Sequence, residues 1–192
     1  MVRTHSTMRL LPGASAPPFR LPDPRGRQHS LADATGPVLV AFLCNHCPFV
    51  KHIREGFAAL AREAIGRGVA VYGINSNDSV QHPDDAPDRM LDEIQDAGYA
   101  FPYLVDETQA VAIAYGAACT PDFFLFDAGK RLVYRGRMDG SRPDSGTPVT
   151  GADLRAAIDA VLAGRPPIPD QQPSLGCNIK WKPRNAPEWF KP

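Results

Sequence analysis

The feature that most constrains the fold is an apolar segment that leads directly into a pair of cysteines. Residues 38–43 (VLVAFL) form an unbroken apolar run, which is the pattern of a strand buried on both faces of a sheet. The cysteine pair follows at 44–47 (CNHC), and from Val50 the apolar residues recur with helical spacing until 66–68 (GRG). The sequence therefore predicts a buried strand, a loop with two cysteines and a long amphipathic helix, in that order.

Strand and helix patterns alternate along the rest of the chain. The later predicted elements are strands at 69–74 and 103–105, helices at 83–97, 109–115 and 153–162, and two hairpins that turn at 22–27 and 127–130. Strands that alternate with helices favour parallel pairing, whereas the second hairpin adds antiparallel strands. The sequence therefore predicts an α/β fold, with a central mixed β-sheet, helices on both of its faces and a β-hairpin near the N-terminus.

Proline is concentrated at the two ends of the chain. Of 20 prolines, six lie in 1–37 and seven in 166–192, which indicates extended end segments rather than disorder throughout. The C-terminal segment also carries two tryptophans and a phenylalanine, and aromatic side chains of this size usually pack. We therefore expect one domain over 1–164 and an extended, proline-rich C-terminal arm over 165–192 that docks on it.

Composition and charge argue against two classes of partner. Lys plus Arg and Asp plus Glu each number 21, so the formal net charge is zero, and the positive field that gathers nucleic acid or anionic lipid is missing. No apolar run reaches the length of a signal peptide or a membrane helix. We therefore expect a cytoplasmic protein that binds neither nucleic acid nor membrane. In a reducing cytoplasm, four cysteines point to redox chemistry, metal binding or burial rather than to structural disulfides.

The cysteine pair has the spacing of a dithiol that cycles through a disulfide. Because a helix dipole and unpaired amides stabilise a thiolate at a helix start, we expect an exposed Cys44 to attack a substrate disulfide. Cys47, one turn into the helix, would then resolve the mixed disulfide. His46 lies between the two and, when protonated, would lower the Cys44 pKa further. Half of a zinc site and a pair of buried thiols remain as alternatives, although the sequence has no second closely spaced Cys/His pair.

Three segments resemble the thioredoxin-like superfamily: 41–48 (AFLCNHCP), 101–106 (FPYLVD) and 115–127 (YGAACTPDFFLFD). The resemblance covers most of the chain and implies a thioredoxin-like fold. It also implies that Pro121 follows a cis peptide bond beside the cysteine pair, and that the backbone of Thr120 bonds an extended substrate there.

Within this superfamily, the N-terminal hairpin and the segment 101–106 are similar to the redoxin branch, which holds the alkyl hydroperoxide reductase/thiol-specific antioxidant proteins. The chain most resembles peroxiredoxin-like members that combine a CxxC motif with a Gly-Cys-x-Ile-Lys-Trp segment, here 176–181 (GCNIKW). Peroxiredoxins carry Pro-x-x-x-Thr-x-x-Cys around the thiol that reacts with peroxide. Aligned on Cys47, those places hold Val40 and Cys44, so the resemblance implies thiol redox chemistry more firmly than peroxide reduction.

The chain also departs from a typical thioredoxin. Leu43 stands where a thioredoxin has a tryptophan, and 38–43 contains no buried acid that could accept a proton from the second cysteine. His46 and water remain as candidates for deprotonating Cys47.

The other two cysteines leave several readings open. Cys177 would be a third thiol or a metal ligand if the arm folds back, and otherwise a small buried hydrophobe. Cys119 should lie near the active site, in buried packing. A copper or zinc site would use Cys44, Cys47, His46 and Cys177, but neighbours within one helical turn make poor joint ligands. We therefore predict no metal and no other cofactor.

These observations together predict a thiol–disulfide oxidoreductase. Its substrate would be a disulfide-containing protein, or a small-molecule disulfide or peroxide, and its electron donor is left unidentified. One alternative is a thiol peroxidase that uses Cys47 or Cys44, with the other thiol or Cys177 resolving. Another is a redox sensor or metal-binding module without turnover.

Overall fold

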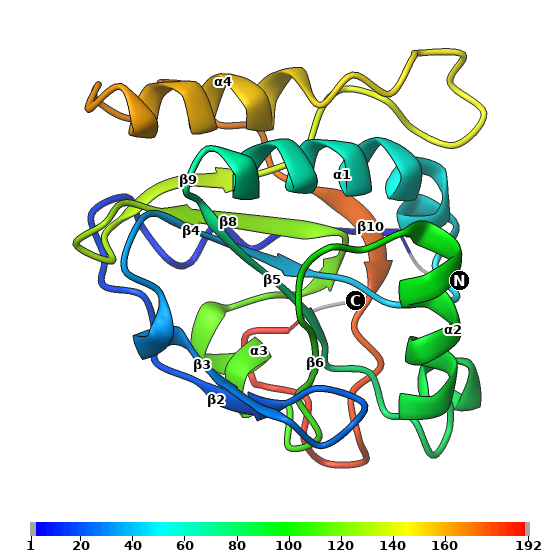
Figure 1. Ribbon diagram of the computed structural model, residues 1–192. Coiled ribbons are helices and arrows are strands. Elements are labelled where there is room, and N and C mark those ends of the chain that lie inside the picture. The colour runs from blue at the N-terminus through cyan, green and yellow to red at the C-terminus, as the bar shows by residue number, and fades with distance from the viewer. Residues whose placement is uncertain (1–2, 191–192) are drawn as a thin grey trace.

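A five-stranded mixed sheet forms the centre of the molecule, with the strands in the order β6-β5-β4-β8-β9 (Figure 1). The central strand β4 (Val38–Phe42) pairs in parallel with β5 (Ala70–Asn75) and antiparallel with β8 (Asp122–Phe126). Outside them, β6 (Tyr103–Val105) is parallel to β5, and β9 (Leu132–Gly136) is antiparallel to β8. The predicted mixed sheet is confirmed.

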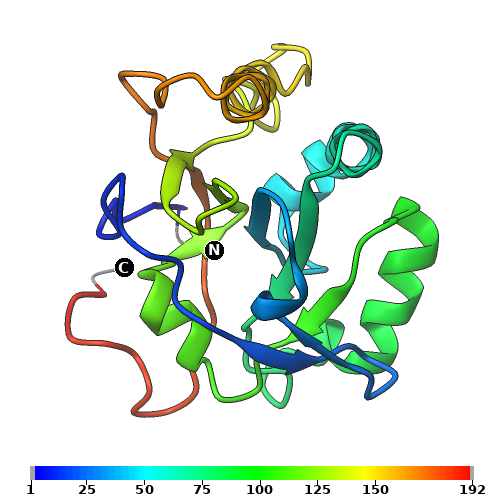
Figure 2. The same ribbon diagram turned by 60° about the vertical axis from the view of Figure 1, so that its left-hand side comes forward.

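The structure is a computed structural model that describes residues 3–190. Helices cover both faces of the sheet, as predicted. On one face, apolar side chains of β4 such as Leu39 and Ala41 share a core with the helices α1 (Pro48–Gly66), α2 (Pro87–Ala97) and α4 (Ala152–Leu162). Figure 2 views α1 and α4 nearly end-on, above the sheet.

The opposite face of the sheet is covered by shorter elements. Val38, Val40 and Phe42 point to this face because side chains alternate along a strand. They pack against α3 and against the hairpin predicted near the N-terminus. The bounds of these elements are Ala110–Tyr115 for α3, Arg20–Pro22 for β2 and Gln28–Ser30 for β3.

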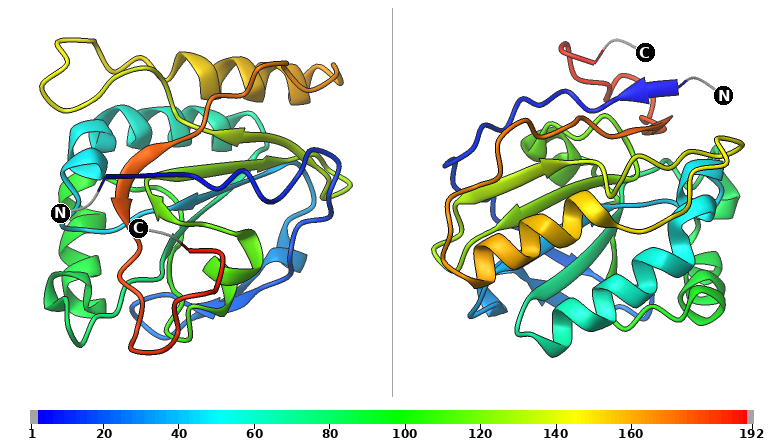
Figure 3. Two further views of the ribbon diagram at one scale, coloured as in Figure 1. Left: turned by 180° about the vertical axis from the view of Figure 1, so that it is seen from behind. Right: turned by 90° about the horizontal axis from the view of Figure 1, so that it is seen from above.

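A second, three-stranded sheet was not predicted. It joins β1 (Arg3–His5), β10 (Leu175–Asn178) and β7 (Cys119–Thr120) in the order β1-β10-β7, and both pairings are antiparallel. The strand β10 belongs to the C-terminal arm, and Figure 3 shows it in orange beside the blue N-terminal segment. Gly176 allows this approach, because a Cβ built there would lie 1.9 Å from the carbonyl oxygen of Thr120.

The part of the arm that follows β10 lies against the face that α3 covers. Trp181 packs on the core of that face and makes edge-to-face contacts with Trp189 and Phe190, at ring-centroid distances of 6.3 and 5.7 Å. Gln109 donates to the carbonyl oxygen of Lys180 at 2.9 Å. These contacts hold the end of the arm on this face of the central sheet.

The predicted helix at 83–97 is wrong as a single element. The structure has a 3-10 turn, η2 (Pro83–Asp85), followed by α2, which begins at Pro87. Ala86 between them is extended, because the ring of a proline disfavours helical geometry in the residue before it. Within residues 3–190, no helix is both long and apolar enough to span a membrane.

Candidate active site

The two cysteines of the CxxC motif lie where β4 ends and α1 begins. Cys47 is the N-cap residue of α1, and Pro48 occupies the first helical position, where a proline is favoured because its missing N–H has no partner anyway. Cys44 is 1% exposed and Cys47 is fully buried. The prediction of an exposed Cys44 at the helix start is therefore wrong, since the helix begins one turn later and its N-terminus belongs to Cys47.

The C-terminal arm brings a third thiol to this point. In the β10–β7 ladder Cys177 stands opposite Thr120, and its Sγ atom lies 2.6 Å from the Sγ atom of Cys47. Cys177 is 1% exposed. Of the readings that the sequence left open for Cys177, the structure supports the one in which the arm folds back onto the cysteine pair.

A cis-proline loop forms one wall of the site. The Thr120–Pro121 peptide bond is cis, as the family resemblance implied. Cys44 Sγ lies 3.1 Å from the Thr120 hydroxyl, and Cys47 Sγ lies 3.3 Å from the Thr120 carbonyl oxygen. The backbone of Thr120 was expected to pair with an extended substrate, but in the structure it pairs with the chain's own strand β10.

The three thiols differ in their readiness to ionise. Hydrogen bonds from Cys177 and Cys44 lower the pKa of Cys47 far below the ordinary thiol value. The pKa of Cys44 is raised, mainly by burial and next by the bond to Cys47. The pKa of Cys177 is raised too, mainly by the bond to Cys47 and next by burial. A protonated Cys47 donates to the Thr120 carbonyl, and an ionised Cys47 accepts from both neighbouring thiols. These directions favour a thiolate at Cys47, whereas the sequence analysis expected the attacking thiolate at Cys44.

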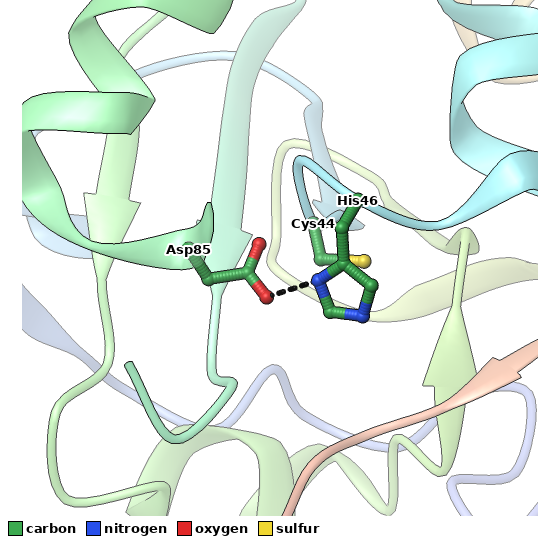
Figure 4. A group of neighbouring side chains, drawn as sticks. All are labelled: Cys44, His46 and Asp85. Carbon is green, nitrogen blue, oxygen red and sulfur yellow. Dashed lines mark ion pairs between the residues drawn. The ribbon is translucent and has the colours of Figure 1, made fainter. Parts of the chain in front are cut away.

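His46 is held by a buried carboxylate that the sequence analysis missed. Its Nδ1 atom lies 2.7 Å from Oδ2 of Asp85 (Figure 4), and its ring stacks on that of His82 with the centroids 5.6 Å apart. The hydrogen bond to Asp85 raises the pKa of His46, although burial acts against it. His46 is thus a cation over a wider pH range than an ordinary histidine.

The η2 turn places Asp85 inside a network of donors. Burial raises its pKa, but bonds from His46, from the Asn77 side chain and from the Asn45 amide outweigh burial and lower it. Asn45 N–H donates at 2.7 Å, and the side-chain amides of Asn75 and Asn77 donate at 3.2 and 2.8 Å. No motif in the sequence marks Asp85, because its partners come from two distant loops.

A metal ion fits this group poorly. One ligand atom each from Cys44, His46 and Asp85 lie within 4.8 Å of one another, which is close enough for a shared ion. The Asp85 carboxylate is already occupied by three N–H donors and by His46, and burial raises the pKa of Cys44. A metal would have to displace those donors and deprotonate that thiol.

The fourth cysteine stands apart from the other three. Cys119 is fully buried, its Sγ atom lies 3.9 Å from the Pro121 carbonyl oxygen, and burial raises its pKa. A surface hollow beside the cis-proline loop has Phe49, Pro121, Leu175 and Arg142 in its lining.

The sequence match now places this geometry in a family. Residues 12–135 match the AhpC/TSA family. The chain belongs to the AhpC/TSA family.

Solved structures also match the chain, although no curated protein does. An uncharacterized conserved protein from Geobacillus kaustophilus is 49% identical, with a TM-score of 0.92 over 95% of this chain and 98% of that one. A hypothetical protein from Sinorhizobium meliloti 1021 is 51% identical, with a TM-score of 0.91 over 93% of this chain and 98% of that one.

More distant structures share the fold of this AhpC/TSA protein. The peroxidoxin BcpB from Mycobacterium tuberculosis is 20% identical, with a TM-score of 0.61 over 81% of this chain and 98% of its own. A putative thiol:disulfide interchange protein DsbE from Chlorobium tepidum is 23% identical, with a TM-score of 0.61 over 80% and 99%. The predicted thioredoxin-like redoxin fold is confirmed, and the family supports a redox function.

Proposed function

We propose that this AhpC/TSA protein is a cytoplasmic thiol–disulfide oxidoreductase whose attacking group is the Cys47 thiolate. The observation that carries the proposal is the position of the Cys47 sulfur, at the N-terminus of α1 and 2.6 Å from the sulfur of Cys177. A low thiol pKa at a helix N-terminus is the setting of a reactive cysteine. The substrate is a protein or small-molecule disulfide, and an external thiol returns the electrons.

The reaction proceeds by exchange of sulfur–sulfur bonds. Cys47 attacks one sulfur of the substrate disulfide, the other sulfur leaves as a thiolate that water protonates, and a mixed disulfide forms on Cys47. Cys44 then attacks Cys47 Sγ, so that the second substrate thiol leaves and a Cys44–Cys47 disulfide remains. Cys44 loses its proton at this step, and the departing substrate sulfur takes it up, because His46 has a raised pKa and is held by Asp85.

Peroxide is a second candidate oxidant, favoured by the place of the thiolate. Cys47, not Cys44, aligns with the peroxide-reactive thiol of peroxiredoxins, and its pKa is the lowered one of the two. Attack on a peroxide oxygen would break the O–O bond, release an alcohol or water and leave a sulfenic acid, which a neighbouring thiol converts to a disulfide with loss of water. Val40 and Cys44 in place of the peroxiredoxin Pro and Thr argue for a slow reaction.

A turnover assay with matched variants tests the proposal. Oxidised glutathione serves as substrate and dithiothreitol as electron donor, with hydrogen peroxide in a parallel series. Cys47→Ser should lower turnover by at least about 100-fold, because it removes the nucleophile. Cys119→Ala, which changes a cysteine that is equally buried but outside the thiol group, should keep turnover within about twofold. Turnover that survives Cys47→Ser overturns the proposal.

A further inference from the structure

We infer that Cys177 is a third redox-active thiol, and that Cys47 alternates between two disulfides, one with Cys44 and one with Cys177. The inference rests on the proposed function in one respect only, that a substrate disulfide supplies the oxidising equivalents. The Cys47–Cys177 disulfide would join the start of α1 to β10, and so connect the C-terminal arm covalently to the active site.

Backbone pairing fixes Cys177 in place on both sides. It stands opposite Thr120 of β7 in one ladder and opposite Arg3 of β1 in the other. Gly176 lets β10 lie directly on the Thr120 carbonyl. Strand pairing on both sides and the close backbone contact at Gly176 therefore fix the position of Cys177.

The sulfur atoms are close enough for the bond to form. Cys47 Sγ and Cys177 Sγ are 2.6 Å apart, so they need to approach by only about 0.6 Å to reach the length of a disulfide bond. Both sulfur atoms belong to buried residues, and Cys47 Sγ also contacts the carbonyl oxygen of Thr120. A thiol held this close to a thiolate competes directly with Cys44 for the mixed disulfide.

The exchange balances without any further oxidant. After Cys47 has formed a mixed disulfide with the substrate, Cys177 attacks Cys47 Sγ, the bond between Cys47 and the substrate breaks, and the substrate thiol leaves with the proton from Cys177. Cys44 can attack Cys47 Sγ in turn, which breaks the Cys47–Cys177 bond and returns a proton to Cys177. This second step moves the disulfide without changing the number of electrons. A low-molecular-weight thiol or a protein dithiol then reduces the protein.

The arm also covers the thiols. Cys44, Cys47 and Cys177 are each no more than 1% exposed, and β10 lies on the Thr120 side of the site. A substrate disulfide therefore reaches Cys47 only when β10 shifts. The Cys47–Cys177 bond would prevent that shift, so the oxidised protein would stay closed until Cys44 attacks Cys47 Sγ, frees Cys177 and releases β10.

Peptide mapping tests the inference directly. Trypsin leaves Cys44 and Cys47 together in the peptide 28–51 and Cys177 in the peptide 156–180, because the bond before Pro166 resists cleavage. A Cys44–Cys47 disulfide stays within one peptide, whereas a Cys47–Cys177 disulfide links the two. The reduced protein is oxidised with oxidised glutathione or, separately, with diamide, alkylated and digested. Linked peptides are expected in the wild type and as the main product in Cys44→Ala, but not in Cys47→Ala.

The variants separate this inference from the proposed function. Cys119→Ala is the matched control and should give the wild-type pattern. Absence of linked peptides from both the wild type and Cys44→Ala overturns the role of Cys177, even if turnover of oxidised glutathione is intact. Linked peptides with diamide but no turnover of oxidised glutathione would instead remove the proposed function and leave the Cys177 assignment standing. Cys177→Ser keeps the side-chain size in β10 and should form the Cys44–Cys47 disulfide alone.

Discussion

The Sγ atoms of Cys47 and Cys177 lie 2.6 Å apart although 130 positions separate them in the chain. One belongs to the N-cap of α1 and the other to the middle of a strand in the C-terminal arm. Their proximity makes the arm part of the active site rather than a cover beside it. The hydrogen bond with Cys177 is also the largest cause of the lowered pKa of Cys47.

Removal of the Cys177 thiol should raise the pKa of Cys47. In Cys177→Ala the thiolate loses its first hydrogen-bond donor, so its ultraviolet absorbance should appear at a pH at least about one unit higher than in the wild type. Cys119→Ala should leave the titration curve of the wild type unchanged, because that side chain makes no contact with Cys47 that lowers its pKa. An unchanged curve in Cys177→Ala would assign the stabilisation of the thiolate to Cys44 and the start of α1.

The pair of His46 and Asp85 should stabilise the fold in a defined pH window. The pKa of Asp85 is lowered below 3.8 and that of His46 is raised above 6.5. The contribution of Asp85 is present above 3.8 and is lost as the pH falls through its lowered pKa. The contribution of His46 is complete below 6.5 and is lost as the pH rises through its raised pKa. The pair is therefore fully charged between pH 3.8 and 6.5.

His46→Gln should accordingly destabilise the protein most at pH 5. A hydrogen bond between charged groups contributes about 1.5–3 kcal/mol, so urea unfolding at pH 5 should show a loss of this size in the free energy of unfolding. At pH 9 the loss should be smaller. The exposed His5 offers a matched control, since His5→Gln should change stability little at either pH. Equal losses for His46→Gln at pH 5 and pH 9 would contradict the charged pair.

The sequence predicted the central elements well and the second sheet not at all. The strand β4 is buried on both faces and therefore appears in the sequence as an unbroken apolar run. The helix α1 is buried on one face and therefore appears as apolar residues at helical spacing. Neither pattern depends on a distant partner. The strands β1 and β10 are three and four residues long and carry no such pattern. Their pairing depends on a long-range ladder that a local pattern cannot show.

The residues of the candidate site also fall into those that the sequence predicted and those that it did not. The residues of the CxxC motif and the cis bond before Pro121 were predicted, because a motif and a family resemblance mark them. The buried state of Cys44 was not predicted, since it depends on packing by the cis-proline loop and the arm. Asp85 was missed for a related reason, because its role comes from donors in the loops of Asn45 and Asn77.

Gly176→Ala should weaken the contact between the arm and the cis-proline loop. The added methyl group would lie 1.9 Å from the Thr120 carbonyl oxygen, so β10 must move away. Overpacking of this kind costs about 1–3 kcal/mol, to be measured as a loss in the free energy of unfolding. Gly66→Ala is the control, because a Cβ there meets nothing within 4 Å. If Gly176→Ala is as stable as the wild type and still links its tryptic peptides, β10 does not depend on this close approach.

Zinc should not compete with disulfide formation at this site. Any zinc site that uses Asp85 must first break its bonds to Asn45, Asn75 and Asn77. Protein purified without chelator should therefore contain well below one equivalent of zinc by elemental analysis, and all three active-site thiols should react with a thiol reagent after unfolding. One equivalent of zinc that remains bound through purification would favour the metal-binding alternative.

Oxidation should slow hydrogen exchange in the C-terminal arm. In the reduced protein, β10 is held by its two ladders and by aromatic contacts such as Trp181 with Phe190, so its amides exchange when the arm opens locally. A Cys47–Cys177 bond prevents that opening, and the amides of β10 should exchange at least about tenfold more slowly. The amides of α4, which lies outside the arm, should exchange at an unchanged rate.

In Cys177→Ser, oxidation produces only the Cys44–Cys47 disulfide and should leave exchange in β10 as it is in the reduced protein. Equal slowing in that variant would mean that the CxxC disulfide itself closes the arm, and that Cys177 acts only through packing.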